Sequence, residues 1–472
     1  MTVTMSLNLL PTSPTGAMAT QFLQVFNSGD KTARERFLET RLSARAKKER
    51  PVTEYLSLVQ KAYRQSGGVE VVRVERTEPN PFVVHVKAKR GDRLAKIFFF
   101  IDKTEPDKIE FFGFIPLVDP LATEEIPGRR DQLSDIEAMT EIEKRVLLAG
   151  EKDLFSGVVL VARDDKPLVE LAVGQSQKSF DVPNRVDTKF NLGSMNKMFT
   201  ALSIAQQVET GNLTLSDKLV DVLPNYPSKE SAEKITVHHL LTHSAGLGGL
   251  FERPEYDRTR KYRSNLDYLP IFANEPLLYE PGTKSSYSNE AYIVLGTIIE
   301  EVSGEDYQDY VRHHIFDPAG MQDTGPFALD ETTPNLAVGY MRYEDDPFGV
   351  EPRHPNHMFL GWRGNACGGG YSTAPDLLKF ATTVKSYKFA NKQLTDEFMR
   401  QQGHMKSYGL GFEVEDFNGK KVVGHTGGGP NSGVNSALKI FWDEPYSIIV
   451  LGNYDAPVAQ DMASIFARFL AS

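Results

Sequence analysis

The segment from Phe190 to Lys197 constrains the fold of this chain more than any other stretch of its sequence. It ends a strand-like run, turns at Gly193 and opens a helix whose apolar residues recur at three- and four-residue steps until Gly211. Residues three apart in a helix lie on one face, so Lys197 Nζ can lie beside Ser194 Oγ. The predicted local structure is strand, turn and helix, with a serine and a lysine paired on one helical turn.

A serine hydroxyl is a weak nucleophile until a neighbouring group takes its proton, and a buried amine that lacks its own proton can do so. The same spacing also occurs at Ser231/Lys234 and Ser436/Lys439. The first pair lies in a charged stretch that indicates a solvated linker, and the second lies in an alternating run where residues i and i+3 face opposite sides of a strand. Only Ser194 is predicted to have a helix that aligns the pair.

With 472 residues the chain is longer than one hydrophobic core usually serves, so we expect more than one domain. From about residue 16 to 118, expected helices at 18–26, 33–42 and 52–63 precede expected strands at 69–74, 82–89, 95–101 and 109–114. This order predicts a small α+β domain with helices on an antiparallel sheet. By element order it resembles the cone-shaped domains of the nuclear-transport-factor-like type, and we expect an accessory role because it holds no catalytic constellation.

The charged, proline-containing stretch 121–130 indicates a linker, which divides the chain into domains 1–128 and 129–472. In the second domain a helix is expected at 133–148 and a hairpin at 157–174. Strands return near the end at 421–424, 434–441 and 446–451, before a last helix at 458–470. We therefore expect an α+β fold: one antiparallel sheet built from both ends of the domain and flanked by helices, with the middle inserted as a helical lobe. A cleft is expected between sheet and lobe.

Charge and composition argue against several classes of protein. The net charge of -10 disfavours general nucleic-acid binding, and glutamates interrupt the basic run 31–50, which predicts a solvated helix face. No apolar run reaches the roughly twenty residues of a membrane-spanning helix. The short apolar patch 7–10 has no preceding basic residue and does not fit a secretory signal, which leaves the compartment open. The single cysteine, Cys367, excludes an intramolecular disulfide and is expected to be a small buried residue.

Three short motifs follow one another in the second domain: Ser194 to Lys197 on a helix, Tyr287 to Asn289 in a loop, and His425 to Gly427 on a strand. In order and surroundings they resemble the serine β-lactamase and penicillin-binding-protein family, in its class C-like branch of esterases and D-peptidases. The family set of class A enzymes reads Ser-x-x-Lys, Ser-Asp-Asn and Lys-Thr-Gly, so this chain departs from it at Tyr287 and His425. Phrases at 239–247, 281–283, 318–321 and 369–373 are also similar, and the resemblance covers about residue 135 to the C-terminus.

The resemblance implies catalytic roles for five residues: Ser194, Lys197, Tyr287, Asn289 and His425. Ser194 would attack a carbonyl carbon, while Lys197 and the Tyr287 phenol would share the transfer of its proton to the leaving group. A phenol can take part only when a nearby cation stabilises its phenolate, and Lys197 would supply that cation. Asn289, which both donates and accepts hydrogen bonds, would orient Lys197 and the substrate.

The third motif is implied to shape the substrate site. The backbone N–H groups of Ser194 and Gly428 would receive the oxyanion, and Thr426 and Gly427 would let substrate approach the strand. His425 stands where the family set has a permanently charged lysine, and a histidine is charged only part of the time near neutral pH. This favours esters or peptides of less fixed charge over penicillins, whose carboxylate needs a cation.

We therefore predict a β-lactamase-like serine hydrolase that forms an acyl-enzyme on Ser194 and hydrolyses esters or D-amino-acid-type amides and peptides. β-Lactamase or D,D-carboxypeptidase activity is the alternative within the class, and a non-catalytic binding protein on the same fold is the alternative outside it. No cofactor is expected. His239 and His243 are four apart, as zinc ligands can be, but no glutamate lies between them and no metal is expected. The expected partner is a small-molecule ester, amide or peptide, and the loops 248–269 and 340–364 are expected to wall its pocket.

Overall fold

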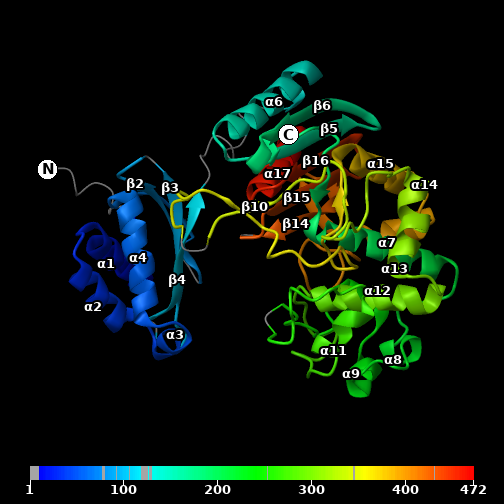
Figure 1. Cartoon of the computed structure of the whole chain (residues 1–472), viewed down its shortest axis with the longest axis horizontal. Helices are drawn as coiled ribbons and strands as arrows, with labels where there is room; N and C mark the ends of the chain where they lie inside the picture. The colour runs from blue at the N-terminus through cyan, green and yellow to red at the C-terminus, as the bar shows by residue number, and fades with distance from the viewer. Residues whose placement is uncertain are drawn as a thin grey trace. The chain divides into compact units, whose positions relative to one another are not determined.

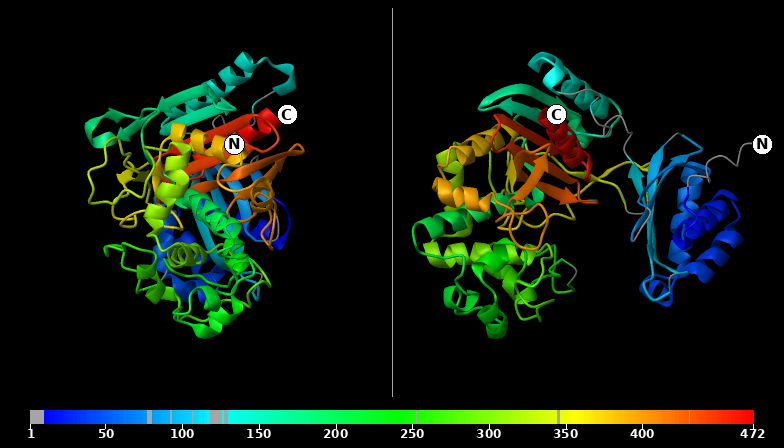
Figure 2. Two further views of the ribbon diagram at one scale, coloured as in Figure 1. Left: turned by 90° about the vertical axis from the view of Figure 1, so that its right-hand side faces the viewer. Right: turned by 180° about the vertical axis from the view of Figure 1, so that it is seen from behind.

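The structure is a computed structural model that describes residues 10–76, 80–91, 93–105, 107–117, 126, 130–251, 253–343, 346–429 and 431–472. The chain divides into two compact units (Figures 1 and 2). The first comprises residues 1–120 and 342–354, and the second comprises residues 121–341 and 355–472. The domain boundary predicted at 128/129 and most of the predicted linker 121–130 lie outside the described residues, so the boundary stays a prediction.

The first unit is a four-stranded antiparallel sheet in the order β1-β2-β3-β4 with helices packed on one face (Figure 1). The expected helices and strands are present, and the short helix α3 was not expected. The elements are α1 (Pro14–Asn27), α2 (Lys31–Arg41), α3 (Ala44–Glu49), α4 (Val52–Ser66), β1 (Val69–Arg76), β2 (Phe82–Ala88), β3 (Leu94–Ile101) and β4 (Ile109–Leu117).

Side-chain alternation builds the core of this unit. Strand β3 alternates between buried and partly exposed residues along its whole length, so one face of the sheet meets the helices. The Phe22 ring of α1 lies 5.3 Å, centroid to centroid, from both Phe99 and Phe112. The expectation of a solvated face over 31–50 is wrong at Arg34, which is buried, donates from Nη2 to Phe26 O at 2.6 Å and lies over the Tyr63 ring.

A segment distant in sequence completes the first unit. Phe348 is 2% exposed, belongs to its hydrophobic core, and lies with its ring 6.3 Å from that of Phe114. The Gln65 side chain donates to Asp346 Oδ1 at 2.9 Å and accepts from the Phe348 backbone N–H at 3.2 Å. Residues 342–354 are thus part of this fold, a long-range pairing that local sequence patterns do not indicate.

The second unit is built on a six-stranded antiparallel sheet in the order β13-β14-β15-β16-β5-β6. Because β16 pairs with β5, the first and last strands of the unit lie side by side, which confirms the expected sheet built from both ends. Strand β14 extends five residues beyond the expected 421–424, and β13 was not expected. The strands are β5 (Gly157–Arg163), β6 (Lys166–Val173), β13 (Glu413–Phe417), β14 (Lys420–Gly429), β15 (Val434–Phe441) and β16 (Tyr446–Gly452).

Helices cover both faces of this sheet. Figure 1 shows α6 (Asp135–Glu151) and α17 (Val458–Ala471) on one face, and α7 (Asn196–Glu209) and α15 (Ala374–Lys385) on the other. The start of α6 is fixed by a capping box, in which Ser134 and Glu137 each bond the other's backbone N–H. Within the described part of the chain, no helix has the length and apolarity to cross a membrane.

In the sequence the helical lobe is inserted between the early strands β5 and β6 and the late strands β13 to β16, as expected, and Figure 2 shows its helices below the sheet. The remaining helices are α8 (Leu219–Val222), α9 (Lys229–Lys234), α10 (Val237–Leu241), α11 (Leu269–Phe272), α12 (Asn289–Ser303), α13 (Tyr307–Val311), α14 (Asp317–Ala319) and α16 (Lys392–Phe398). The short strands are β7 (Gln175–Gln177), β8 (Val182–Pro183), β9 (Phe190–Asn191), β10 (Tyr340–Met341), β11 (His354–Pro355) and β12 (Tyr371–Ser372).

Candidate active site

Ser194 lies in a short 3₁₀ turn, Gly193–Met195, between β9 and α7, which confirms the predicted strand, turn and helix. The turn packs backbone against backbone on β14. Gly193 has φ +51°, and a Cβ there would lie 2.4 Å from Gly428 N. A Cβ on Gly427 would lie 1.9 Å from Leu192 O. Only glycine fits at these two positions, and this close approach sets Ser194 beside Gly428.

Lys197 is fully buried one turn after Ser194, and its Nζ has three close contacts. They are Ser194 Oγ at 3.1 Å, Asn289 Oδ1 at 2.8 Å and Cys367 O at 2.6 Å. The two carbonyl oxygens only accept, whereas a hydroxyl both donates and accepts. Every contact is therefore satisfied whether the amine carries two protons or three. A proton can pass between Ser194 Oγ and Lys197 Nζ without moving either side chain.

Tyr287 lies directly before α12 and is 43% exposed. Its ring centroid is 4.8 Å from Lys197 Nζ, and the ring stacks on that of His243 at 4.4 Å. Burial, with the charge of Lys197 adding to it, holds the pKa of His243 well below its usual range, and His243 Nδ1 accepts from Ser288 N–H at 3.0 Å. Among the hydrogen bonds of the described residues, none involves the Tyr287 hydroxyl.

The His425 side chain is buried and hydrogen-bonded at both nitrogens. Nδ1–H donates to Thr426 O at 2.6 Å, so Nε2 accepts from the Tyr408 hydroxyl at 3.1 Å. Burial lowers the pKa of His425 although the neighbouring Glu413 opposes the shift, and the neutral form is favoured near neutral pH. The expectation of a partly charged His425 is corrected accordingly.

Thr426 is also engaged inside the protein. Its backbone N–H and its hydroxyl donate to Glu413 Oε1 at 3.1 and 2.5 Å. Gly427 accepts at its carbonyl from Gln460 Nε2 at 3.0 Å. The structure brings Ser194, Lys197 and Asn289 into direct contact, whereas the side chains of the third motif hold β14.

One cavity opens in front of Ser194. Its volume is about 420 Å³, and Ser194, Asn289 and Gly428 all line it. The two loops expected to wall the pocket do so, through Phe251, Tyr256, Arg258 and Tyr268 of the first and Phe359, Leu360, Gly361 and Arg363 of the second. This size accommodates a small organic substrate.

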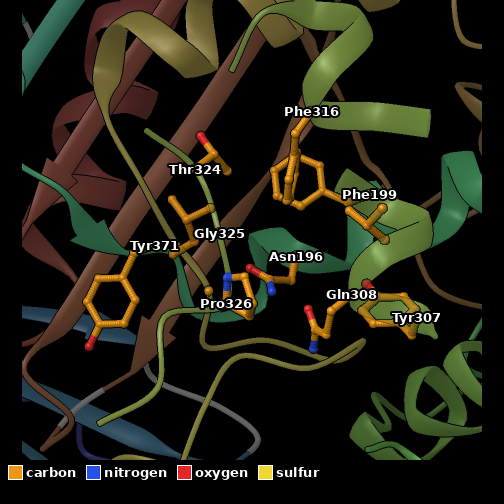
Figure 3. A pocket seen from close by; sticks show the side chains of 12 residues that line it. Asn196, Phe199, Tyr307, Gln308, Phe316, Thr324, Gly325, Pro326 and Tyr371 are labelled. Carbon is orange, nitrogen blue, oxygen red and sulfur yellow. The ribbon is translucent and has the colours of Figure 1, made fainter. Parts of the chain in front are cut away.

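A second cavity lies beside α7, next to Asn196 and Phe199, and Figure 3 shows the side chains of Asn196, Pro326 and Gln308 gathered around it. Its volume is about 10 Å³. Such a space holds about one water molecule and no substrate, so the larger cavity is the candidate substrate site.

The competing Ser231/Lys234 pair does lie on a helix, α9, so the prediction that only Ser194 has a helix to align its pair is wrong. The Ser194/Lys197 and Ser231/Lys234 pairs differ in the group that the lysine contacts. Lys234 Nζ lies 3.2 Å from Glu230 and 3.7 Å from Glu280, and it is turned to carboxylates instead of a serine.

His239 and His243 do not share a helix face. His239 belongs to α10 and accepts at Nδ1 from Thr236 N–H at 3.2 Å, while His243 lies beyond the helix end with φ +55°. Across the part of the chain that the structure describes, no group of three or more His, Cys, Asp or Glu side chains could hold a metal ion.

Two contacts of the site escaped the sequence analysis. Cys367 is buried as expected, and burial raises the pKa of its thiol to about 11, but its carbonyl oxygen contacts Lys197. No sequence signal marks a backbone carbonyl, because every residue has one. The stacking of His243 under Tyr287 had a partial signal, since His243 lies in the family-like phrase 239–247.

Known proteins resemble this chain in sequence and in fold. Residues 137–471 match the family described as Beta-lactamase. Penicillin-binding protein 4* of Bacillus subtilis (strain 168) is 29% identical over 337 residues, covering 67% of this chain and 72% of that protein. Esterase EstB of Burkholderia gladioli is 32% identical over 210 residues, covering 42% of this chain and 53% of the relative. The crystal structure of a penicillin binding protein from Bacillus halodurans has a TM-score of 0.61 and 29% identity, and covers 68% of this chain and 98% of that one.

The match spans the six-stranded sheet, the lobe and α7, and it leaves out residues 1–120 of the first unit. The chain therefore belongs to the Beta-lactamase family, a family of serine hydrolases that act on esters and amides through an acyl-enzyme.

Proposed function

We propose that Ser194 is the nucleophile of this hydrolase and that the enzyme cleaves esters or D-amino-acid-type amides and peptides. The observation that carries the proposal is the 3.1 Å contact between Ser194 Oγ and the buried Lys197 Nζ, whose other two contacts are carbonyl oxygens. The relatives named as an esterase and a penicillin-binding protein support a carbonyl substrate of the ester or amide type.

In the proposed mechanism, Ser194 Oγ attacks the carbonyl carbon as its proton passes to Lys197 Nζ. The oxyanion that forms is received by the backbone N–H groups of Ser194 and Gly428, which line the same cavity. The proton then reaches the leaving group through Tyr287, whose ring lies against Lys197 and stabilises its cation. Water attacks the acyl-enzyme by the reverse path and releases the acid.

The remaining residues support this centre. Asn289 holds Lys197 through its carbonyl oxygen and keeps its amide N–H groups for the substrate. We assign His425 and Thr426 to the positioning of β14, since their side chains bond Tyr408 and Glu413. Gly427 allows the Ser194 turn to approach the strand. For the first unit we propose an accessory role.

A fluorophosphonate probe tests the nucleophile, because it reacts only with an activated serine. We expect it to label the wild-type protein and not Ser194→Ala. The matched control is Ser203→Ala, which removes a buried hydroxyl within α7 that donates to Phe199 O at 2.9 Å. Equal labelling of Ser194→Ala would refute the assignment. No labelling of the folded wild-type protein would favour a non-catalytic binding protein.

The substrate class is tested by parallel assays with short acyl p-nitrophenyl esters, D-alanyl peptides and a chromogenic cephalosporin. We expect turnover of the esters or the peptides to exceed that of the cephalosporin, because the neutral His425 places no cation at the strand position where the family set has lysine. A cephalosporin turned over fastest would establish the β-lactamase alternative.

A further inference from the structure

The charged side chains in the described wall of the substrate cavity are all positive. Its described wall contains no aspartate, glutamate or lysine side chain, and its two charged residues are Arg258 and Arg363. Most of the remaining wall is aromatic, aliphatic or glycine, so the arginines face little that neutralises them. A cavity of this kind favours an anionic ligand with an apolar part.

The two arginines differ in their surroundings. Arg258 is exposed and donates from Nη1 to Phe359 O at 3.4 Å. Arg363 is half-buried, its Nε is shielded from solvent, and this Nε has no hydrogen-bond partner within the described residues. Nor does any carboxylate of those residues form an ion pair with Arg363. A shielded donor on a permanent cation is costly to leave unpaired, and a bound anion removes that cost.

The third motif supplies no cation to bind an anionic group of the substrate. His425 stands at the position of the lysine in the family set, but it is buried, its pKa is lowered, and both ring nitrogens are engaged within the protein. No charge is supplied to the substrate from that strand position. Arg363 is a cation that lines the same cavity from the loop 340–364.

We propose that Arg363 is a specificity-determining residue that binds a carboxylate on the substrate, while the aromatic wall takes the apolar part. Planar guanidinium groups bind carboxylates through two parallel hydrogen bonds, which fixes orientation as well as charge. The substrate class is then an ester or amide that carries a carboxylate away from the scissile bond. This rests on the proposed function in which Ser194 attacks that bond.

A matched pair of esters tests the proposal. The mono-p-nitrophenyl ester of succinic acid and p-nitrophenyl butyrate have acyl chains of similar length, and only the first carries a carboxylate. We expect Arg363→Gln to lower kcat/KM for the succinate ester about ten- to hundredfold, the range of charge-assisted hydrogen bonds, and that for butyrate less than about twofold. Arg363→Lys should recover part of the loss. Arg258→Gln should lower the succinate value by less than about threefold, because an exposed charge is screened.

An equal fall for both esters after Arg363→Gln would overturn the proposal, and so would a larger effect of Arg258→Gln. A binding measurement tests the role of Arg363 independently of the proposed hydrolysis at Ser194. By calorimetry, Ser194→Ala should bind 3-phenylpropionate more tightly than 3-phenylpropanamide, and the added Arg363→Gln change should abolish that difference. A difference that persists without Arg363 overturns the inference even where no ester is hydrolysed. Wild-type protein that hydrolyses neither ester, yet shows the Arg363-dependent binding, overturns the proposed function alone.

Discussion

Replacing Lys197 by methionine removes the amine and keeps the length and burial of the side chain. The change deletes the 3.1 Å contact between Lys197 Nζ and Ser194 Oγ. It also removes the donor to Asn289 Oδ1 and to Cys367 O, and no other described residue donates a hydrogen bond to either oxygen. Ser194 then keeps its place in the turn but loses the group that takes its proton.

The expected loss follows from those contacts. A positioned base contributes about 10²- to 10⁴-fold to the rate, so kcat/KM should fall by that factor, which corresponds to about 3–5 kcal/mol of transition-state stabilisation. The buried Cys367 O and the partly buried Asn289 Oδ1 also lose their donor. Each such loss costs about 1–3 kcal/mol, so the free energy of unfolding should fall by at least about 2 kcal/mol.

The assay measures p-nitrophenyl ester hydrolysis and denaturant unfolding on the same protein samples. Lys385→Met is the matched control, because Lys385 Nζ also donates to two backbone carbonyls, Phe441 O at 2.8 Å and Glu444 O at 2.5 Å, away from the substrate cavity. It should lose similar stability and keep its activity. If Lys197→Met retained more than about a tenth of the wild-type kcat/KM while folded, Lys197 would not be the base.

Three further outcomes are expected. Gly427→Ala should lower the rate of ester hydrolysis at least about a hundredfold, because the added Cβ would lie 1.9 Å from Leu192 O and would push the Ser194 turn off β14. Unchanged ester hydrolysis would contradict that packing. Phe348→Ala should lower the free energy of unfolding of the first unit by about 3 kcal/mol in denaturant titrations, because the substitution opens a cavity in the core of that unit. A change below about 1 kcal/mol would show that residues 342–354 do not belong to this core. Burial raises the pKa of Glu300 to about 7, so the folded state binds a proton that the unfolded state lacks between about pH 4.5 and 7, and stability should fall as pH rises through this window. Glu300→Gln should remove this fall, on the order of 2 kcal/mol, in thermal melts from pH 4.5 to 8, and an unchanged pH slope would refute the buried-acid interpretation.

The sequence predicted those parts of the fold that local patterns determine. The alternation of β3 and the glycine-bounded helix α7 are local signals, and both elements form where they were expected. Strand β14 was underestimated because glycines are poor strand formers, and the run from Gly427 to Gly429 is held in the sheet by its pairing with β15. The burial of Phe348 depends on a partner more than two hundred residues away, which no local pattern encodes.

The candidate site also combines contacts that local sequence predicts with contacts that depend on distant parts of the chain. Ser194 and Lys197 were predicted to meet because helix geometry brings residues three apart onto one face, and they do, with Ser194 in the 3₁₀ turn just before α7. The side chain of His425 could not be placed from sequence, because its charge depends on burial and on the partners Tyr408 and Glu413, which arrive from elsewhere in the chain. Arg363 had no motif to mark it, and only its position in the cavity wall makes it a candidate.

Trapping the reaction intermediate shows whether Ser194 carries the acyl group. Turnover of p-nitrophenyl butyrate is quenched with acid within the first catalytic cycles, and the protein is digested and mapped by mass spectrometry. We expect one added butyryl group, located on Ser194 and absent from Ser194→Ala. A butyryl group mapped to any other residue in the active wild-type enzyme would contradict it.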